Sequence, residues 1–276
     1  MNYRQRKKVG LVIRYFVALF VVFVAISPIL WLFLTSIKTQ REAFAMPPVF
    51  KFKPVMDNYK ELFTNGPFLK YLWNSFYIAM MATIIASILG TPLAYMLSRF
   101  AFRGKQALSF WVLASRIAPP MAIVLPFFLM FRVLGLLNTY TSIISIYMTL
   151  NIAFFVWMMK GYFDQVPIAI EESARIDGCS IISSMLLIAL PLVAQGLAAT
   201  LVFTFIANWS EFVLALIFTG MNTRTLPVLI SGYVTTEGVK WGMIGAAGTL
   251  VNLPIIIFSL TLQKYLVTGM TAGAVK

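Results

Sequence analysis

The chain consists of long apolar runs separated by short polar stretches. A helix needs roughly 20 mostly apolar residues to cross the hydrocarbon core of a bilayer. The runs of suitable length are Tyr15 to Ile37, Tyr71 to Ser98, Gln106 to Phe131 with Arg116 inside, Val133 to Met159, Gly178 to Ser210, and Trp241 to Gln263. This pattern predicts an all-α integral membrane protein with about six transmembrane helices.

Composition supports the same class. Hydrophobic residues make up 60% of the chain and charged residues 11%, whereas soluble domains carry about 25% charged residues. No small-residue cleavage site follows the first run, so we interpret that run as a retained helix. We expect residues 1–276 to form a single membrane domain.

The formal charge of +13 comes mostly from cations in the tails and connecting segments. Such a distribution favours anchoring on the positive side of a membrane over nucleic-acid binding. The absence of histidine and the single cysteine, Cys179, argue against His-based catalysis, an internal disulfide and a metal site. We therefore predict no catalytic residue and no metal.

The orientation is predicted from the N-terminal cations Arg4, Arg6, Lys7 and Lys8, because the first helix and short loops weigh most in the positive-inside rule. With six spans both termini are then cytoplasmic, as tails 1–10 and 264–276. Segment 38–70, with Pro47, Pro48, Pro54 and Pro67, is predicted to be an irregular external loop. Segment 160–191 is predicted to be a cytoplasmic loop.

That cytoplasmic loop contains the most informative stretch of the chain, VPIAIEESARIDGCSIISSMLLIALP from Val166 to Pro191. We expect a short helix that presents the carboxylates of Glu171 and Glu172 to a partner. Gly178 can adopt a left-handed conformation that ends this helix and allows a second one to start at Ser180. Pro191 is expected in the first turn of the next span.

Within this stretch, six of the seven positions of the spacing E-A-A-x3-G-x9-I-x-L-P are matched, and only Ser173 departs from it. The stretch resembles the cytoplasmic coupling motif of binding-protein-dependent ATP-binding-cassette (ABC) importers, and the resemblance extends over nearly the whole chain. The stretches DNYKELF, SRIAPPMAIVLPFFL, NWSEFVLALI and QKYLVTGMTAGAVK are similar to the maltose-type permeases of carbohydrate importers, particularly the smaller permease subunit. At Ser210 that family more often has asparagine.

The resemblance implies the type I ABC importer permease fold with a cytoplasmic coupling helix, in a bacterial or archaeal cytoplasmic membrane. It implies import of a sugar or oligosaccharide by alternating access. The implied partners are a second permease subunit in a heterodimer, two ATPase subunits, an extracytoplasmic sugar-binding protein and membrane lipid, but no nucleic acid. The implied coupling residues are Glu171, Glu172, Ser173, Ala174, Asp177, Gly178 and Pro191.

The energy source is expected to lie outside this chain. The sequence contains no G-x4-G-K-[ST] phosphate-binding loop. ATP and Mg are therefore expected on the partner ATPase subunits, and no cofactor on this chain. By resemblance, Glu172 would bond to a basic group in a cleft of an ATPase subunit, and Gly178 would allow the bend.

Polar groups at membrane depth are costly, which makes each of them a candidate for the translocation pathway. The candidates are Arg116, Asn151, Asn208, Trp209, Glu211 and Asn252. The asparagines could equally join helices to one another. Glu211 lies either toward the outer leaflet or deeper, if the fifth span kinks near Trp209.

Two other classes fit less well. A transporter driven by an ion gradient needs carboxylates within its spans, and Glu211 is the single candidate. An intramembrane enzyme would need catalytic groups within the membrane, but this sequence has no histidine and no paired carboxylates in its spans. Within the importer class, an amino acid, peptide or phosphate cargo remains an alternative to carbohydrate.

Overall fold

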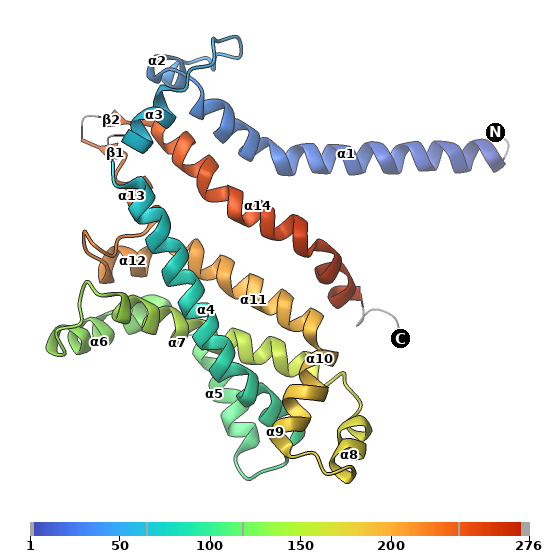
Figure 1. Cartoon of the computed structure of the whole chain (residues 1–276). Helices are drawn as coiled ribbons and strands as arrows, with labels where there is room; N and C mark the ends of the chain where they lie inside the picture. The colour runs from blue at the N-terminus through green and yellow to red at the C-terminus, as the bar shows by residue number, and fades with distance from the viewer. Residues whose placement is uncertain (1–2, 65, 118, 237, 272–276) are drawn as a thin grey trace. The chain divides into compact units, whose positions relative to one another are not determined.

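The computed structural model describes residues 3–64, 66–117, 119–236 and 238–271, with side-chain surroundings from residue 10 to residue 260. Figure 1 labels the helices and strands of the chain. The chain divides into two compact units. Unit 1 comprises Met1–Phe68 and Ile230–Leu253, and unit 2 comprises Leu69–Leu229 and Pro254–Lys276. Each unit is described by itself.

The described secondary-structure elements of unit 2 are all helices. Its elements are α4 (Phe68–Arg99), α5 (Lys105–Ile117), α6 (Pro120–Val133), α7 (Tyr140–Phe163), α8 (Ile168–Ile176), α9 (Ile181–Ser184), the π-helix Met185–Ala189, α10 (Leu190–Leu192), α11 (Ala194–Trp209), α12 (Val213–Phe218) and α13 (Leu226–Ser231). The central helix is α7, which packs against α5, α6, α11 and α12.

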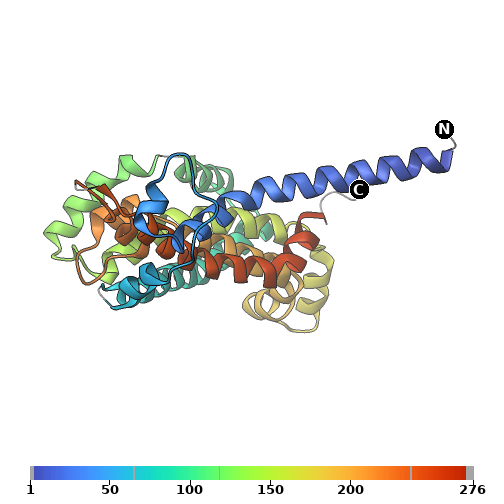
Figure 2. The ribbon, with the colours of Figure 1, turned by 90° about the horizontal axis from the view of Figure 1, so that it is seen from above.

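Unit 1 contains the long helix α1 (Tyr3–Ser36), the short helices α2 (Gln40–Phe44) and α3 (Asp57–Thr64), and a small hairpin of β1 (Val234–Thr235) and β2 (Gly238–Val239). The hairpin is antiparallel, with Val234 opposite Val239. Helix α14 (Trp241–Thr271) starts in unit 1 and continues into unit 2. Figure 2 shows α1 as one continuous helix.

The helices account for the predicted membrane spans. Among the described residues, α4, α7, Gly10–Ser36 of α1 and Trp241–Leu260 of α14 are each long and apolar enough to cross a bilayer. The bent pairs α5 with α6 and Ile181–Leu192 with α11 raise the number to six if each pair is one span. The predicted all-α class with about six spans is therefore confirmed.

Two clusters of buried side chains form the core described for unit 2. One joins the end of α4 to α7 and the π-helix, through residues such as Leu97, Phe155 and Ala189. The other joins the start of α4 to α7 and α12, through residues such as Ile78, Tyr147 and Phe218. These clusters hold the helices that carry the candidate site.

Segment 38–70 is less irregular than expected, because it contains α2 and α3. Thr39 and Glu42 form a capping box at the start of α2, in which each side chain accepts from the backbone of the other residue. Pro47, Pro48 and Pro54 lie between the two helices, and Pro67 directly precedes α4. Proline therefore separates helices here and interrupts none of them.

The predicted tails are helical where the structure describes them. Residues 3–10 belong to α1, and residues 264–271 belong to α14. The side chains of Arg4, Arg6, Lys7 and Lys8 and the last residues, 272–276, lie outside the described residues. The cytoplasmic side of both tails stays a prediction.

Candidate functional site

The loop between α7 and α11 forms a helix-turn-helix projection at one end of unit 2, with α8 and α9 side by side (Figure 1, Figure 2). Pro167 is the N-cap of α8, and its fixed φ suits a helix start. Ser180 is the N-cap of α9, and its side chain accepts a bond from the Ser183 N–H at 3.1 Å. The predicted start of a second helix at Ser180 is confirmed.

The turn between the two helices depends on Gly178, which has a φ of +94°. The Gly178 N–H donates to the Arg175 carbonyl at 3.1 Å, and the Cys179 N–H donates to the Ala174 carbonyl at 3.0 Å. These two bonds define a Schellman motif, in which a left-handed residue ends a helix. The predicted left-handed glycine is confirmed.

The outer face of α8 carries both charged and apolar side chains. Glu172, Arg175 and Asp177 are exposed, and Ile176 keeps 87% of its surface accessible. Ser173 donates its hydroxyl to the Ala169 carbonyl at 2.9 Å, so the residue that departs from the motif is satisfied within its own helix.

Glu171 was expected to face a partner, but it turns inward. Its side chain is only 5% exposed and pairs with Arg99 at the end of α4, with 2.7 Å between Arg99 Nε and Glu171 Oε1. The buried Tyr95 hydroxyl donates to the other carboxylate oxygen. Of the two adjacent carboxylates only Glu172 therefore faces outward, because Glu171 neutralises a cation of its own chain.

The contacts around Arg99 tie the whole loop to α4. Its second terminal nitrogen donates to the Val166 carbonyl at 3.0 Å, just before α8. The neighbouring Ser98 donates to the Asp164 carboxylate at 2.6 Å, and Lys160 pairs with the same carboxylate at 2.6 Å. These contacts connect α8 and the segment before it to the end of α4.

The ionisation of Asp164 reflects these contacts. Partial burial raises the pKa of its carboxyl, but hydrogen bonds from Lys160 and Ser98 favour the carboxylate more strongly, so the pKa lies below its ordinary value. Arg99 adds a smaller attraction in the same direction. Asp164 is therefore charged wherever this loop works near neutral pH.

Pro191 does not lie in the first turn of a straight span. It belongs to α10, and the chain bends by 82° before α11 begins at Ala194. The preceding turn is a π-helix, in which the Leu190 N–H bonds to the Met185 carbonyl. Because proline lacks a backbone donor, the normal bonding pattern cannot continue through Pro191.

A second feature is a cavity of about 160 Å³ inside unit 2, which brings together three of the predicted pathway residues. Arg116, Asn151 and Glu211 all line it. Arg116 is otherwise exposed and lies over the Phe154 ring, 5.3 Å from the centroid. The cavity is smaller than the roughly 300 Å³ at which pockets for drug-sized ligands begin.

Residues 86–272 match the family described as the binding-protein-dependent transport system inner membrane component. The chain belongs to this family. It is therefore a multi-pass inner membrane component of a transport system, and members of this family are permease subunits, not ATPases.

Relatives agree with this assignment, and a solved structure shares the fold. The permease is 38% identical over 254 residues to the probable ABC transporter permease protein y4oR of Sinorhizobium fredii, covering 92% of this chain and 91% of the relative. It is 32% identical over 263 residues to the trehalose/maltose transport system permease protein MalG of Thermococcus litoralis, covering 94% of each chain. The fold matches a chain in the crystal structure of a bacterial ABC transporter involved in the import of the acidic polysaccharide alginate. That match has a TM-score of 0.80 and 23% identity, and covers 96% of the permease and 99% of that chain.

The buried asparagines of the permease join helices. Asn151 of α7 donates to Asn208 of α11 at 2.7 Å, and Asn208 donates to Thr83 of α4 at 3.1 Å. Apolar lipid gives helices little reason to associate, so such bonds contribute directly to their packing, at about 0.6 kcal/mol each. For Asn208 the contacts favour the structural role, whereas Asn151 also faces the cavity.

The Glu211 carboxylate caps a helix. It accepts the Leu214 N–H at 3.0 Å and the Ala215 N–H at 3.3 Å, at the start of α12. The Tyr147 hydroxyl donates to it at 3.3 Å. Helix α11 ends at Trp209, so the expected break near this residue is present. The Glu211 carboxylate accepts hydrogen bonds from N–H groups that are left without helical partners at the start of α12.

The remaining pathway candidates lie away from the cavity lining. Trp209 is 2% exposed and stacks on Phe205, with ring centroids 5.7 Å apart. Asn252, in unit 1, donates to the Gly248 carbonyl one turn earlier in α14. A pathway role for these two residues stays a prediction.

Several residues that position the coupling loop were not singled out from the sequence as site residues. These residues are Arg99, Lys160, Tyr95, Ser98 and Asp164. The sequence signal that could have predicted these contacts is a basic residue at the end of one apolar run, together with carboxylates in a later loop on the same side of the membrane. It does not say which of two adjacent glutamates turns inward.

Proposed function

We propose that this permease imports a carbohydrate by alternating access, driven by ATP hydrolysis on partner subunits that contact α8. The observation that carries this proposal is the projecting α8 with its exposed Glu172, held rigidly by the buried Arg99–Glu171 pair. A rigid connection allows a movement imposed on α8 to reach the membrane helices.

The proposed assembly pairs this chain with a second permease subunit, two ATPase subunits and an external sugar-binding protein. The family description names a binding-protein-dependent system, which supports the external partner. ATP and Mg would be held by the ATPase subunits. Both termini and the α8 loop would then face the cytoplasm, with segment 38–70 on the outer side.

The carbohydrate cargo rests on the relatives. MalG of Thermococcus litoralis is named for trehalose and maltose, and the matching structure for alginate import. The cavity beside Arg116, Asn151 and Glu211 offers polar groups of both charges, which could contact hydroxyl groups during passage. Its small size means that the second permease subunit would have to supply part of any sugar site.

The test is ATPase activity of the purified complex in lipid, with binding protein loaded with candidate sugars. We expect one sugar to stimulate turnover of the wild type, and Glu172→Lys to abolish the stimulation. Truncating one partner of a close charge pair costs about 2–5 kcal/mol, and reversing its sign should cost at least as much.

The matched control is Asp57→Lys, which makes the same charge change at an exposed carboxylate of unit 1. This variant should retain sugar-stimulated turnover. Stimulation by an amino acid, a peptide or phosphate alone would contradict the carbohydrate assignment. Transport in vesicles without ATP would contradict the importer mechanism.

A further inference from the structure

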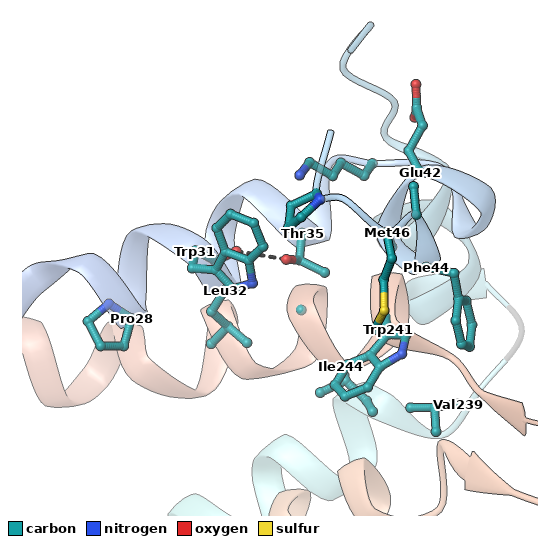
Figure 3. A pocket seen from close by; sticks show the side chains of 15 residues that line it. Pro28, Trp31, Leu32, Thr35, Glu42, Phe44, Met46, Val239, Trp241 and Ile244 are labelled. Atoms are coloured by element: carbon teal, nitrogen blue, oxygen red, sulfur yellow. Dashed lines mark hydrogen bonds between the residues drawn. The ribbon is translucent and has the colours of Figure 1, made fainter. Parts of the chain in front are cut away.

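Unit 1 contains a pocket of about 480 Å³ that has no part in the proposed coupling (Figure 3). Its walls include Trp31 and Leu32 of α1, Phe44 at the end of α2, and Trp241 and Ile244 of α14. These side chains come from segments some 200 residues apart in sequence, yet they surround one space. The volume lies in the range of ordinary ligand pockets.

The pocket lies beside a close helix contact that fixes its walls. Gly245 of α14 faces α1 so closely that a Cβ there would lie 2.7 Å from the Ser36 backbone nitrogen. A Cβ on Gly248 would lie 2.9 Å from Leu32. Small residues allow two membrane helices to approach in this way. The close packing of α1 and α14 therefore fixes the position of two walls of the pocket in unit 1.

A buried cation lines this apolar pocket. Lys38 is only 2% exposed, and its ammonium lies 4.8 Å from the centroid of Trp31 and 4.9 Å from that of Phe52. Among the described residues its ammonium has neither a carboxylate within salt-bridge distance nor a hydrogen-bond acceptor. Two aromatic rings compensate a desolvated charge only in part.

The nearby Glu42 carboxylate is hydrogen-bonded to Thr39 and forms no salt bridge with Lys38. Glu42, in the same wall, accepts the Thr39 backbone N–H at 3.1 Å and the Thr39 hydroxyl at 2.7 Å. The Thr35 hydroxyl donates to the Trp31 carbonyl at 2.8 Å (Figure 3). The lining thus carries one ammonium and one carboxylate, and the carboxylate is engaged by Thr39. The Lys38 ammonium is left to meet an anionic headgroup and the rest of the lining is mostly apolar, which suits an amphiphile and not a sugar with many hydroxyl groups.

The position along the chain points to the membrane boundary. The span of α1 ends at Ser36, and the span of α14 begins at Trp241, so the pocket lies where both helices leave the apolar region. Tryptophan is enriched at that boundary, and both Trp31 and Trp241 lie there. The available neighbours at this depth are phospholipids.

We propose that this pocket binds one anionic phospholipid. Its phosphate pairs with the Lys38 ammonium, and an acyl chain lies along Leu32 and Ile244. Charge complementarity selects the anionic headgroup, and the apolar walls select the chain. Arg41 of α2 and the exposed Lys51 and Lys53 add positive charge in the same segment.

The experiment is native mass spectrometry of the complete transport complex in mild detergent, titrated with phosphatidylglycerol or phosphatidylcholine of identical acyl chains. We expect the wild type to retain phosphatidylglycerol about fivefold more tightly than phosphatidylcholine, the effect of one lysine near a charged headgroup. Lys38→Gln should remove this preference. Lys51→Gln, which deletes an exposed cation of the same segment, should keep it.

Two further arms separate the alternatives. Ile244→Trp fills the pocket without changing charge, and it should weaken retention of both lipids equally. Inorganic phosphate at millimolar concentration should not displace phosphatidylglycerol, because it lacks the acyl chain.

The proposal is overturned if Lys38→Gln keeps the preference for phosphatidylglycerol or if phosphate alone competes. It is also overturned if the complete complex retains no lipid because the second permease covers the pocket. None of these outcomes depends on sugar-stimulated turnover, so the test is separate from that of the proposed function.

Discussion

Arg99 and Glu171 form the contact on which the position of α8 depends. Both side chains are less than one-tenth exposed, and Tyr95 and the Val166 carbonyl complete their hydrogen bonds. A buried pair of this kind adds little net stability compared with apolar residues, but each partner needs the other. Its main contribution is to fix one geometry.

Arg99→Met should therefore destabilise the permease by about 3–5 kcal/mol, because it leaves the Glu171 carboxylate buried without a cation. Thermal unfolding of the purified complex would measure the loss. The double variant Arg99→Met with Glu171→Met should be more stable than the single variant, since no charge is stranded. The exposed Arg103→Met is the matched control, and equal stability of Arg99→Met and Arg103→Met would contradict the proposed role.

Asp164 makes the attachment of the loop sensitive to acid. Its folded-state pKa lies below its ordinary value of 3.8, so its contacts stabilise the fold fully above that value. This stability is lost as pH falls through the depressed pKa. The difference in unfolding temperature between wild type and Asp164→Asn should be constant near neutral pH and shrink as the pH falls below 3.8. A difference that grows on acidification would contradict this sign.

The projection formed by α8 and α9 depends on one backbone conformation. Gly178 has a left-handed φ, and nothing lies within 4 Å of the position of a Cβ there. A side chain would therefore meet backbone strain and no clash. The two bonds of the Schellman motif hold this conformation in place.

Gly178→Ala should cost about 1–2 kcal/mol, the penalty for a left-handed residue that carries a Cβ. It should lower sugar-stimulated ATPase activity, because α8 would change direction relative to α9. Gly161→Ala is a suitable control, since Gly161 also has open space but lies within α7. If both variants behave alike, the conformation of Gly178 is not what sets the geometry of the projection.

Local features of the sequence predicted local structure well. The glycine turn at Gly178 and the cap at Ser180 follow from a few adjacent residues, as do the apolar runs of the spans. Contacts between distant residues were harder to predict. Which of Glu171 and Glu172 turns inward depends on Arg99, 72 residues earlier, and the bridge from Asn151 through Asn208 to Thr83 joins three separate helices.

At the scale of the whole chain, the candidate spans differ in how much of each is buried. Within α1, the stretch Gly10–Ser36 forms a candidate span in which none of the most apolar window is buried, whereas half of that window in α7 is buried. An apolar surface of this length requires lipid or another subunit around it. This surface of α1 therefore suits a membrane environment.

The two neighbouring glutamates of α8 would be under different evolutionary constraints. A change at Glu171 can be compensated within the same gene, by a matching change at Arg99. A change at Glu172, whose proposed partner lies on an ATPase subunit, can be compensated only by a change in a second gene. Two consecutive codons would then follow separate histories, one tied to this permease and the other to its ATPase.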